Sequence, residues 1–187
     1  VENTVVGKRS FTQIGRGNLV FNSITVKGAP QFIELREDYG ATWDGTITFK
    51  GNNKFETSGD SNVVLFEIND SNVNAVDAND KKIDVDHGYD IQLPDIKFEG
   101  NIKVSNTNTL YIFDSSAERM IKQYKNINSV DDIKAKSGFS DSEIKYDKKT
   151  GKYTIKSSKI SGVDNVLLFC DDCVKPSSCK ADKCKKK

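Results

Sequence analysis

The sequence predicts a mainly β protein with a short helical insertion near residues 115–137. Apolar and polar residues alternate in many short runs, as at 96–99, which is the pattern of strands with one buried face. Gly, Asn, Asp and Ser gather between the runs, as expected of turns. The stretch 115–137 alone changes to a helical period.

The runs recur along the chain in one order: a strand, a turn, a second strand and a third, more apolar strand. The clearest copy has Gly100 at a sharp bend, and the acidic, Asn-rich segment 69–95 supplies only short strand-like pieces. The four copies span residues 19–35, 47–68, 96–113 and 144–169.

The spacing of the copies suggests a repeat. Phe49 lies 49 positions before Phe98, Phe98 lies 48 before Tyr146, and each gap is about twice 24. A coil of about 20–25 residues is typical of a β-solenoid or β-roll. A two-sheet β-sandwich also produces short strands with regularly spaced turns, so both arrangements stay open.

Helix signals define the insertion. Ser115 and Glu118 have the spacing of a capping box, Ser129 marks a second helix start and Gly138 a stop. The apolar stripe consists of Met120, Ile121, Tyr124 and Ile127.

We expect one β-rich domain over residues 1–169 and a Cys-rich, Lys-ended tail over 170–187. Residues 1–14 form either an ordinary first strand or an N-terminal arm that pairs with a neighbouring subunit. Residue 1 is Val, so we expect either a processed or a trimmed chain, and an extracellular protein if a secretion signal was removed.

The overall charge argues against nucleic acid as a partner. Lys and Arg number 28 and Asp and Glu 27, so the chain has no global basic field. No run approaches the roughly 20 apolar residues that a membrane span requires.

The acidic segment is the first candidate site. Asp84, Asp86 and Asp90 present oxygens at alternating positions beside a glycine, as a Ca²⁺ loop requires. Asp77 and Asp80 lie nearby. The alternatives are a solvated acidic loop, which we favour, and a catalytic carboxylate pair.

The second candidate is the cysteine cluster, Cys170, Cys173, Cys179 and Cys184, with the spacing C-x2-C-x5-C-x4-C. In an exported protein two disulfides are the favoured interpretation. A four-thiolate Zn²⁺ site is less favoured because the middle spacing is short, and free or intermolecular thiols are the third alternative.

The third candidate is an aromatic platform. Tyr39 and Trp43 with Asp44 could stack on a sugar ring and accept its hydroxyl hydrogen bonds. The alternative, which we favour, is a Trp that closes one end of the core.

These observations favour a secreted or cell-surface structural or adhesive subunit over an enzyme. Such a subunit would assemble into a filament or surface layer by strand pairing, with Ca²⁺ as a stabilising ion. The alternative is a carbohydrate-binding module or a small glycan-active β protein. The expected partners are further copies of the chain, or a surface polymer or glycan.

Overall fold

The computed structural model describes residues 2–6, 11–13, 17–28, 31–36, 45–57, 62–69, 79, 92–170 and 173. These residues form a mainly β fold with two short helices, which confirms the predicted class and the helical insertion. Neither helix has the length and apolar character of a membrane-crossing segment.

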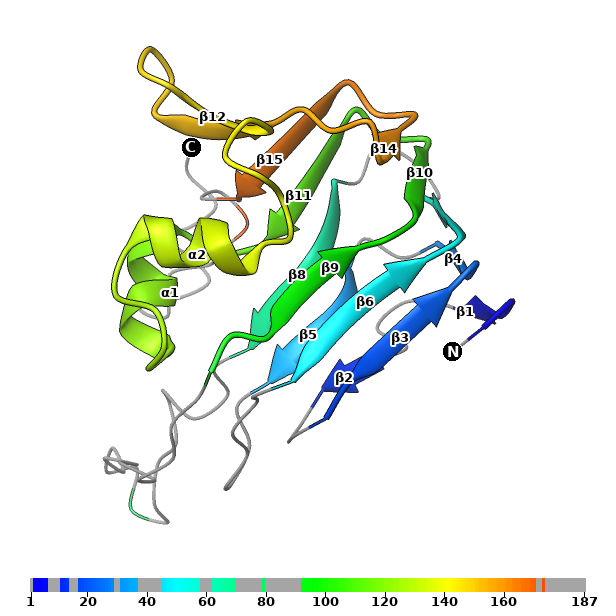
Figure 1. Ribbon diagram of the computed structural model, residues 1–187, viewed down its shortest axis with the longest axis horizontal. Coiled ribbons are helices and arrows are strands. Elements are labelled where there is room, and N and C mark those ends of the chain that lie inside the picture. Colours follow the sequence, from blue (N-terminus) through cyan, green and yellow to red (C-terminus); the bar gives the residue numbers. More distant parts are fainter. Residues whose placement is uncertain are drawn as a thin grey trace.

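The strands lie in three sheets (Figure 1). A three-stranded sheet has the order β3 (Leu19–Asn22), β6 (Thr46–Lys50), β9 (Asp95–Phe98). A five-stranded sheet has the order β1 (Val5–Val6), β4 (Thr25–Lys27), β7 (Asn52–Glu56), β10 (Asn101–Ser105), β14 (Ile160–Ser161). A seven-stranded sheet has the order β12 (Ile144–Asp147), β13 (Lys152–Ile155), β15 (Asn165–Phe169), β11 (Thr109–Phe113), β8 (Val63–Asn69), β5 (Gln31–Arg36), β2 (Phe11–Gln13).

The chain visits the three sheets in turn, and we call each such circuit a coil. The complete coils are β3–β4–β5, β6–β7–β8 and β9–β10–β11. Strands of neighbouring coils pair in parallel and in register, for example Phe49 with Phe98. The only antiparallel pairings join β12 to β13 and β13 to β15, within the part of the chain that the structure describes.

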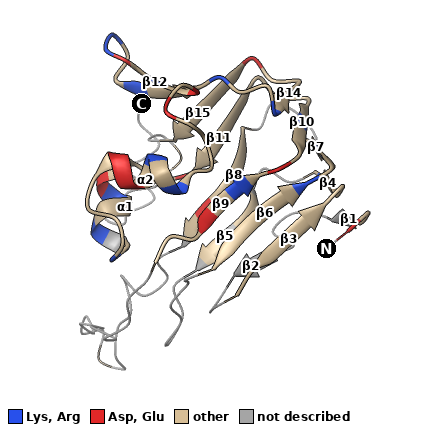
Figure 2. Cartoon of the chain, viewed as in Figure 1, with Lys and Arg blue, Asp and Glu red and all other residues tan. Residues whose placement is uncertain are grey.

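The inner positions of the coils are buried and mostly apolar, with Asn53 of β7 as a buried polar exception, because successive strand residues point to opposite faces. Phe21, Phe49 and Phe98 share one register position in the three-stranded sheet, and each is 3% exposed or less. The outer positions are charged on β9, where Asp95 and Lys97 are exposed (Figure 2).

The direct pairing of Phe49 with Phe98 corrects the predicted repeat. The 49 positions between them form one coil, not two coils of about 24. Tyr146 is likewise not the next copy, since it lies in the antiparallel β12–β13 hairpin.

Two helices follow β11: α1 (Ala117–Gln123) and α2 (Val130–Lys136). Ser116, not Ser115, caps α1, and its Oγ accepts a hydrogen bond from the amide of Arg119 at 3.3 Å. Ser129 caps α2 in a capping box with Asp132, as polar side chains at this position satisfy the first free amides. The predicted apolar stripe is buried at Met120, Tyr124 and Ile127.

Candidate functional site

The N-terminal end of the stacked coils has open strand edges. β1 pairs only with β4, and β2 pairs only with β5, among the residues that the structure describes. An outermost strand presents backbone N–H and C=O groups that another strand can pair with. Neither β1 nor β2 carries a charged residue that would oppose such pairing.

Residues 2–6 are fixed in position by hydrogen bonds to the first complete coil. The amide of Asn3 donates to the Asn22 carbonyl at 2.9 Å, and the amide of Thr25 donates to the Thr4 carbonyl at 2.9 Å. Alternate residues of a parallel strand face the same neighbour. Since Thr4 faces β4 through its carbonyl, the N–H and C=O groups of Val5 face away from β4, toward the open side.

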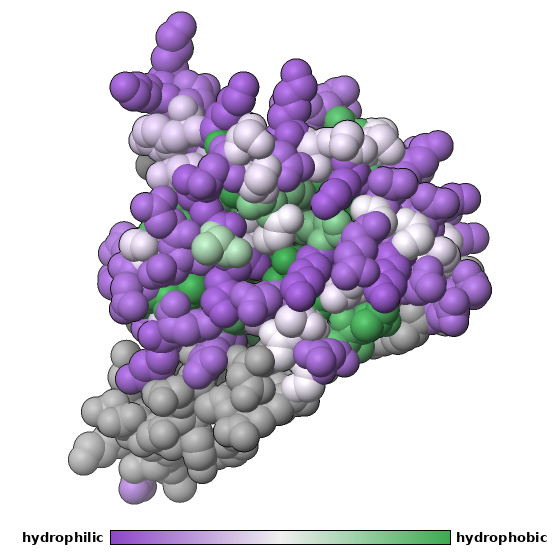
Figure 3. Space-filling model, in the orientation of Figure 1, coloured by the Kyte–Doolittle hydropathy of each residue, from purple (hydrophilic) through white to green (hydrophobic). Residues whose placement is uncertain are grey.

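Apolar side chains are accessible on β3, in the first complete coil. Val20 is 38% exposed and Leu19 is half-buried against the core. The space-filling view shows an apolar surface over this part of the molecule (Figure 3). Open backbone groups and accessible apolar side chains therefore occur together near the N-terminal end.

At the opposite end of the stack the three-stranded sheet is covered, while the five-stranded sheet ends in the two-residue strand β14. The ring of Phe139, just beyond α2, stacks on Phe98 with 4.8 Å between centroids. Gly138 lies against the backbone of Ile96 so closely that an added Cβ would be 2.5 Å from the Ile96 carbonyl oxygen. The edge strand there, β12, exposes Lys145, and lysine on an edge opposes strand addition. The two ends therefore differ in what they offer a partner strand.

A second polar feature lies where β8 and β11 end. Asp114 follows β11 directly, and its Oδ1 accepts a hydrogen bond from the amide of Ile68 at 2.8 Å. Burial raises the pKa of Asp114 to about 6, and the nearby negative charge of Glu67 adds to the increase. The Ile68 amide and the charge of Arg119 act in the opposite direction. Asp114 thus joins two strands and the start of α1 through a carboxyl group that titrates near neutrality.

Nothing in the sequence pattern distinguishes Asp114 before the fold is known. It is a single acid at the end of an apolar strand, and its properties come from β8 and α1. Among the described residues no group of three or more His, Cys, Asp or Glu side chains could hold a metal ion. The hydrogen bond from the Ile68 amide makes Asp114 a structural link between β8 and the residue that follows β11.

The predicted calcium ligands and the aromatic platform lie outside the described residues. These are Asp77, Asp80, Asp84, Asp86 and Asp90, and Tyr39, Trp43 and Asp44. The strands before them are described: β5 ends at Arg36 and β8 ends at Asn69, and these two residues are direct partners. The two segments thus begin at the ends of two adjacent strands of the seven-stranded sheet.

The cysteine cluster is described in part. Cys170 and Cys173 form a disulfide, while Cys179 and Cys184 lie outside the described residues. Cys170 is 2% exposed, and its amide donates to the Phe113 carbonyl at 2.9 Å. The disulfide therefore lies where β15 leaves the seven-stranded sheet.

Comparison with protein-family models, with curated proteins and with solved structures finds no match for this chain.

Proposed function

We propose that the chain is a secreted or cell-surface structural or adhesive subunit, and that its open N-terminal edge pairs with that of a second copy. The proposal is supported mainly by the difference between the two ends of the stacked coils. Among the described residues, the uncharged strands β1 and β2 each pair on one side only, whereas at the other end Phe139 stacks on Phe98 and the edge strand β12 exposes Lys145.

This difference favours a symmetric pair over a head-to-tail chain. A head-to-tail contact would require an open edge at both ends, and a two-fold contact requires only one. Two N-terminal ends that meet about a two-fold axis would pair their edge strands and bury Val20 of each copy. A filament or surface layer would then need a second contact elsewhere on the pair.

Light scattering and electron microscopy of the purified chain test the proposal, with two variants. Val5→Pro removes the outward amide without removing a pairing to β4, and Val20→Lys places a charge in the contact. Both should weaken the pair at least about tenfold. Tyr146→Lys is the matched control, because Tyr146 is 53% exposed at the covered end.

A wild-type chain that stays monomeric at all concentrations would exclude the strand-edge contact. So would a control variant that weakens the pair as much as Val20→Lys does.

The disulfide supports the extracellular location, since disulfides persist mainly in oxidising compartments. Calcium stabilisation through Asp84, Asp86 and Asp90 is a separate part of the proposal. It predicts that Ca²⁺ raises the melting temperature of the wild-type chain and not that of an Asp84→Asn/Asp86→Asn/Asp90→Asn variant. Equal melting temperatures of the wild-type chain with and without Ca²⁺ would contradict stabilisation by calcium.

One observation favours a carbohydrate-binding function as the second candidate. The segments that contain Trp43 and the aspartate cluster follow β5 and β8, whose last residues, Arg36 and Asn69, are direct partners. This candidate predicts glycan-array binding that Trp43→Ala abolishes. Binding that persists in the variant would place the glycan site elsewhere.

A further inference from the structure

The β12–β13 hairpin projects from the body of the protein (Figure 1). Its strands pair antiparallel, with Ile144 opposite Ile155 and Tyr146 opposite Tyr153. Ile144 and Ile155 are buried, and Tyr153 packs edge-to-face on Phe169 with 5.9 Å between centroids. One face of the hairpin is thus anchored to the seven-stranded sheet.

The hairpin concentrates positive charge that the sequence as a whole does not have. Five lysines between positions 144 and 156 are exposed, against a single acid, Asp147, in a chain of net charge +1. The five are Lys145, Lys148, Lys149, Lys152 and Lys156. Figure 2 shows this charge at the turn of the hairpin.

Asp147 offsets only one of the five lysine charges, and the turn itself engages its carboxylate. Asp147 accepts hydrogen bonds from the Lys149 amide at 2.8 Å and from the Thr150 hydroxyl at 3.0 Å, which hold its pKa below the usual range. None of the five lysine side chains forms an ion pair with a carboxylate in the described part of the chain. The ammonium groups are therefore available to an external anion.

The lysines and the aromatic rings of the hairpin lie on opposite faces. Tyr146 is the partner of Tyr153, whose ring is 4.8 Å away, on the face that also carries Ile144 and Ile155. Lys145 and Lys152 lie on the other face, because successive strand residues point to opposite faces. This lysine-bearing face is exposed and is turned away from the anchored side of the hairpin.

We propose that the hairpin β12–β13 binds an anionic polysaccharide. Its lysines pair with carboxylate or sulfate groups along the polymer. An exposed ion pair contributes little by itself, so a useful affinity requires several anionic groups on one molecule. A polymer meets this requirement and a single small anion does not.

The composition of the patch favours a polysaccharide over nucleic acid. Single-strand binding combines a basic groove with several stacking aromatics and often with Arg, whereas the face of this hairpin that carries Lys145 and Lys152 has no aromatic ring and no Arg. The inference does not depend on the strand-edge contact, because that contact lies at the other end of the stack.

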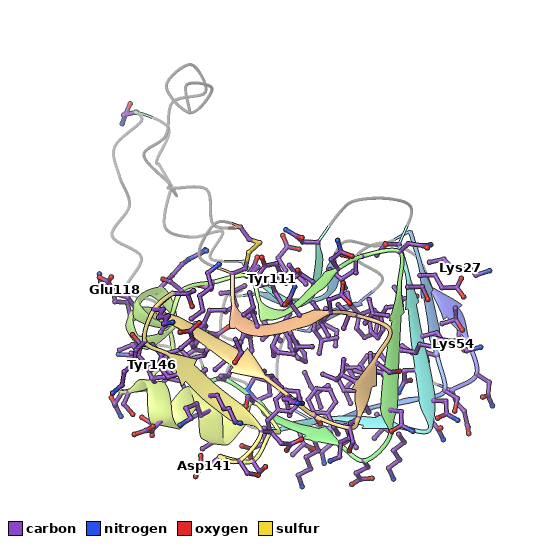
Figure 4. The ribbon with its side chains drawn as sticks, turned by 90° about the horizontal axis from the view of Figure 1, so that it is seen from above. Lys27, Lys54, Tyr111, Glu118, Asp141 and Tyr146 are labelled. Carbon is purple, nitrogen blue, oxygen red and sulfur yellow. A yellow bond between two sulfur atoms is a disulfide. The ribbon has the colours of Figure 1, made fainter. Side chains whose placement is uncertain are left out.

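The test measures binding of the full chain to polygalacturonate, dextran sulfate, neutral dextran and single-stranded DNA at low salt. The test variant is Lys148→Gln/Lys149→Gln/Lys152→Gln. The control, Lys27→Gln/Lys54→Gln/Lys103→Gln, removes the same charge from exposed positions of the five-stranded sheet. Lys27 and Lys54 lie on the side of the molecule away from Tyr146 (Figure 4).

The hairpin variant should lose affinity for an anionic polysaccharide by about tenfold, as expected when three exposed ion pairs are removed. The control variant should lose less than about twofold. Equal losses in both lysine variants, no binding by the wild-type chain, or tighter binding to DNA than to either anionic polysaccharide would overturn the proposal. Light scattering on the same samples reports the strand-edge contact separately.

Discussion

The ring of Phe98 lies flat on the ring of Phe49, with 5.4 Å between centroids and 9° between planes. Phe49 stacks in the same way on Phe21 at 5.5 Å, and Phe139 stacks on Phe98 at 4.8 Å. One row of rings thus runs from the first complete coil to the covering segment. Each ring contributes burial and aromatic contacts to the coil on either side.

Phe98→Ala should lower the free energy of unfolding by about 3–5 kcal/mol, because it leaves a cavity between Phe49 and Phe139. Urea denaturation followed by circular dichroism measures the loss. Lys97→Ala is the control, since Lys97 is exposed on the same strand and should change stability by less than about 0.5 kcal/mol. Similar values for the two variants would mean that the row of rings does not stabilise the coils.

The sequence identifies the strands of this row, but not the coil length. Phe21, Phe49 and Phe98 all stand in alternating runs, and the structure places them at one register position. The gap of 49 misleads because residues 70–91 are added between β8 and β9 without altering the pairing of Phe49 with Phe98. Insertions between repeating strands change the spacing in sequence and leave the stacking intact.

Alternation also does not give the direction of pairing. The run around Tyr146 has the same period as the run around Phe98, yet it pairs antiparallel with β13. Period 2 reports which side chains share a face, whereas the partner strand depends on the connection that precedes it. The properties of Asp114 depend on residues from β8 and α1, which no local pattern contains.

Gly100→Ala should destabilise the protein by about 3 kcal/mol, the upper part of the range for overpacking. A Cβ at Gly100 would lie 2.3 Å from the carbonyl oxygen of Gly51 and 2.5 Å from its nitrogen. These are backbone atoms held by the hydrogen bond from the Asn101 amide to the Gly51 carbonyl, so they cannot move aside cheaply.

Gly151→Ala separates crowding from backbone strain in the same denaturation experiment. Gly151 has φ +69°, and its added Cβ would meet only the Tyr146 hydroxyl at 3.9 Å. Gly151→Ala should therefore lower the free energy of unfolding by about 1 kcal/mol, the cost of a residue with a side chain in the left-handed conformation. If Gly100→Ala lowers the free energy of unfolding less than Gly151→Ala does, the backbone around Gly100 and Gly51 can rearrange to accept the added Cβ.

The stability of the protein should depend on pH through Asp114. The folded-state pKa of about 6 lies above the ordinary value of 3.8 for an aspartate, so the folded protein binds more protons than the unfolded chain between these pH values. Stability is therefore lost as pH rises from about 4 through 6, and the loss amounts to about 3 kcal/mol at full ionisation.

Asp114→Asn isolates this effect, because the amide oxygen can still accept the Ile68 hydrogen bond without carrying a charge. The variant should be more stable than the wild-type chain at pH 8, and the difference should shrink toward pH 4. Groups with lowered pKa values, such as Asp132 and Asp147, act in the opposite direction but are common to both proteins. A difference that does not vary with pH would mean that Asp114 is not desolvated as described.

The Cys170–Cys173 disulfide should be present in the purified chain and should stabilise it modestly. The two cysteines are three positions apart, and a loop this short constrains the unfolded chain by only about 2 kcal/mol. Intact-mass measurement should show two hydrogens fewer than the reduced chain, or four if Cys179 and Cys184 are also joined. Reduction should lower the free energy of unfolding by no more than that 2 kcal/mol, and Cys170→Ser/Cys173→Ser should reproduce the loss. A disulfide sulfur is not a thiolate ligand, so a fully reduced chain that retains Zn²⁺ would contradict this prediction and favour the four-thiolate site.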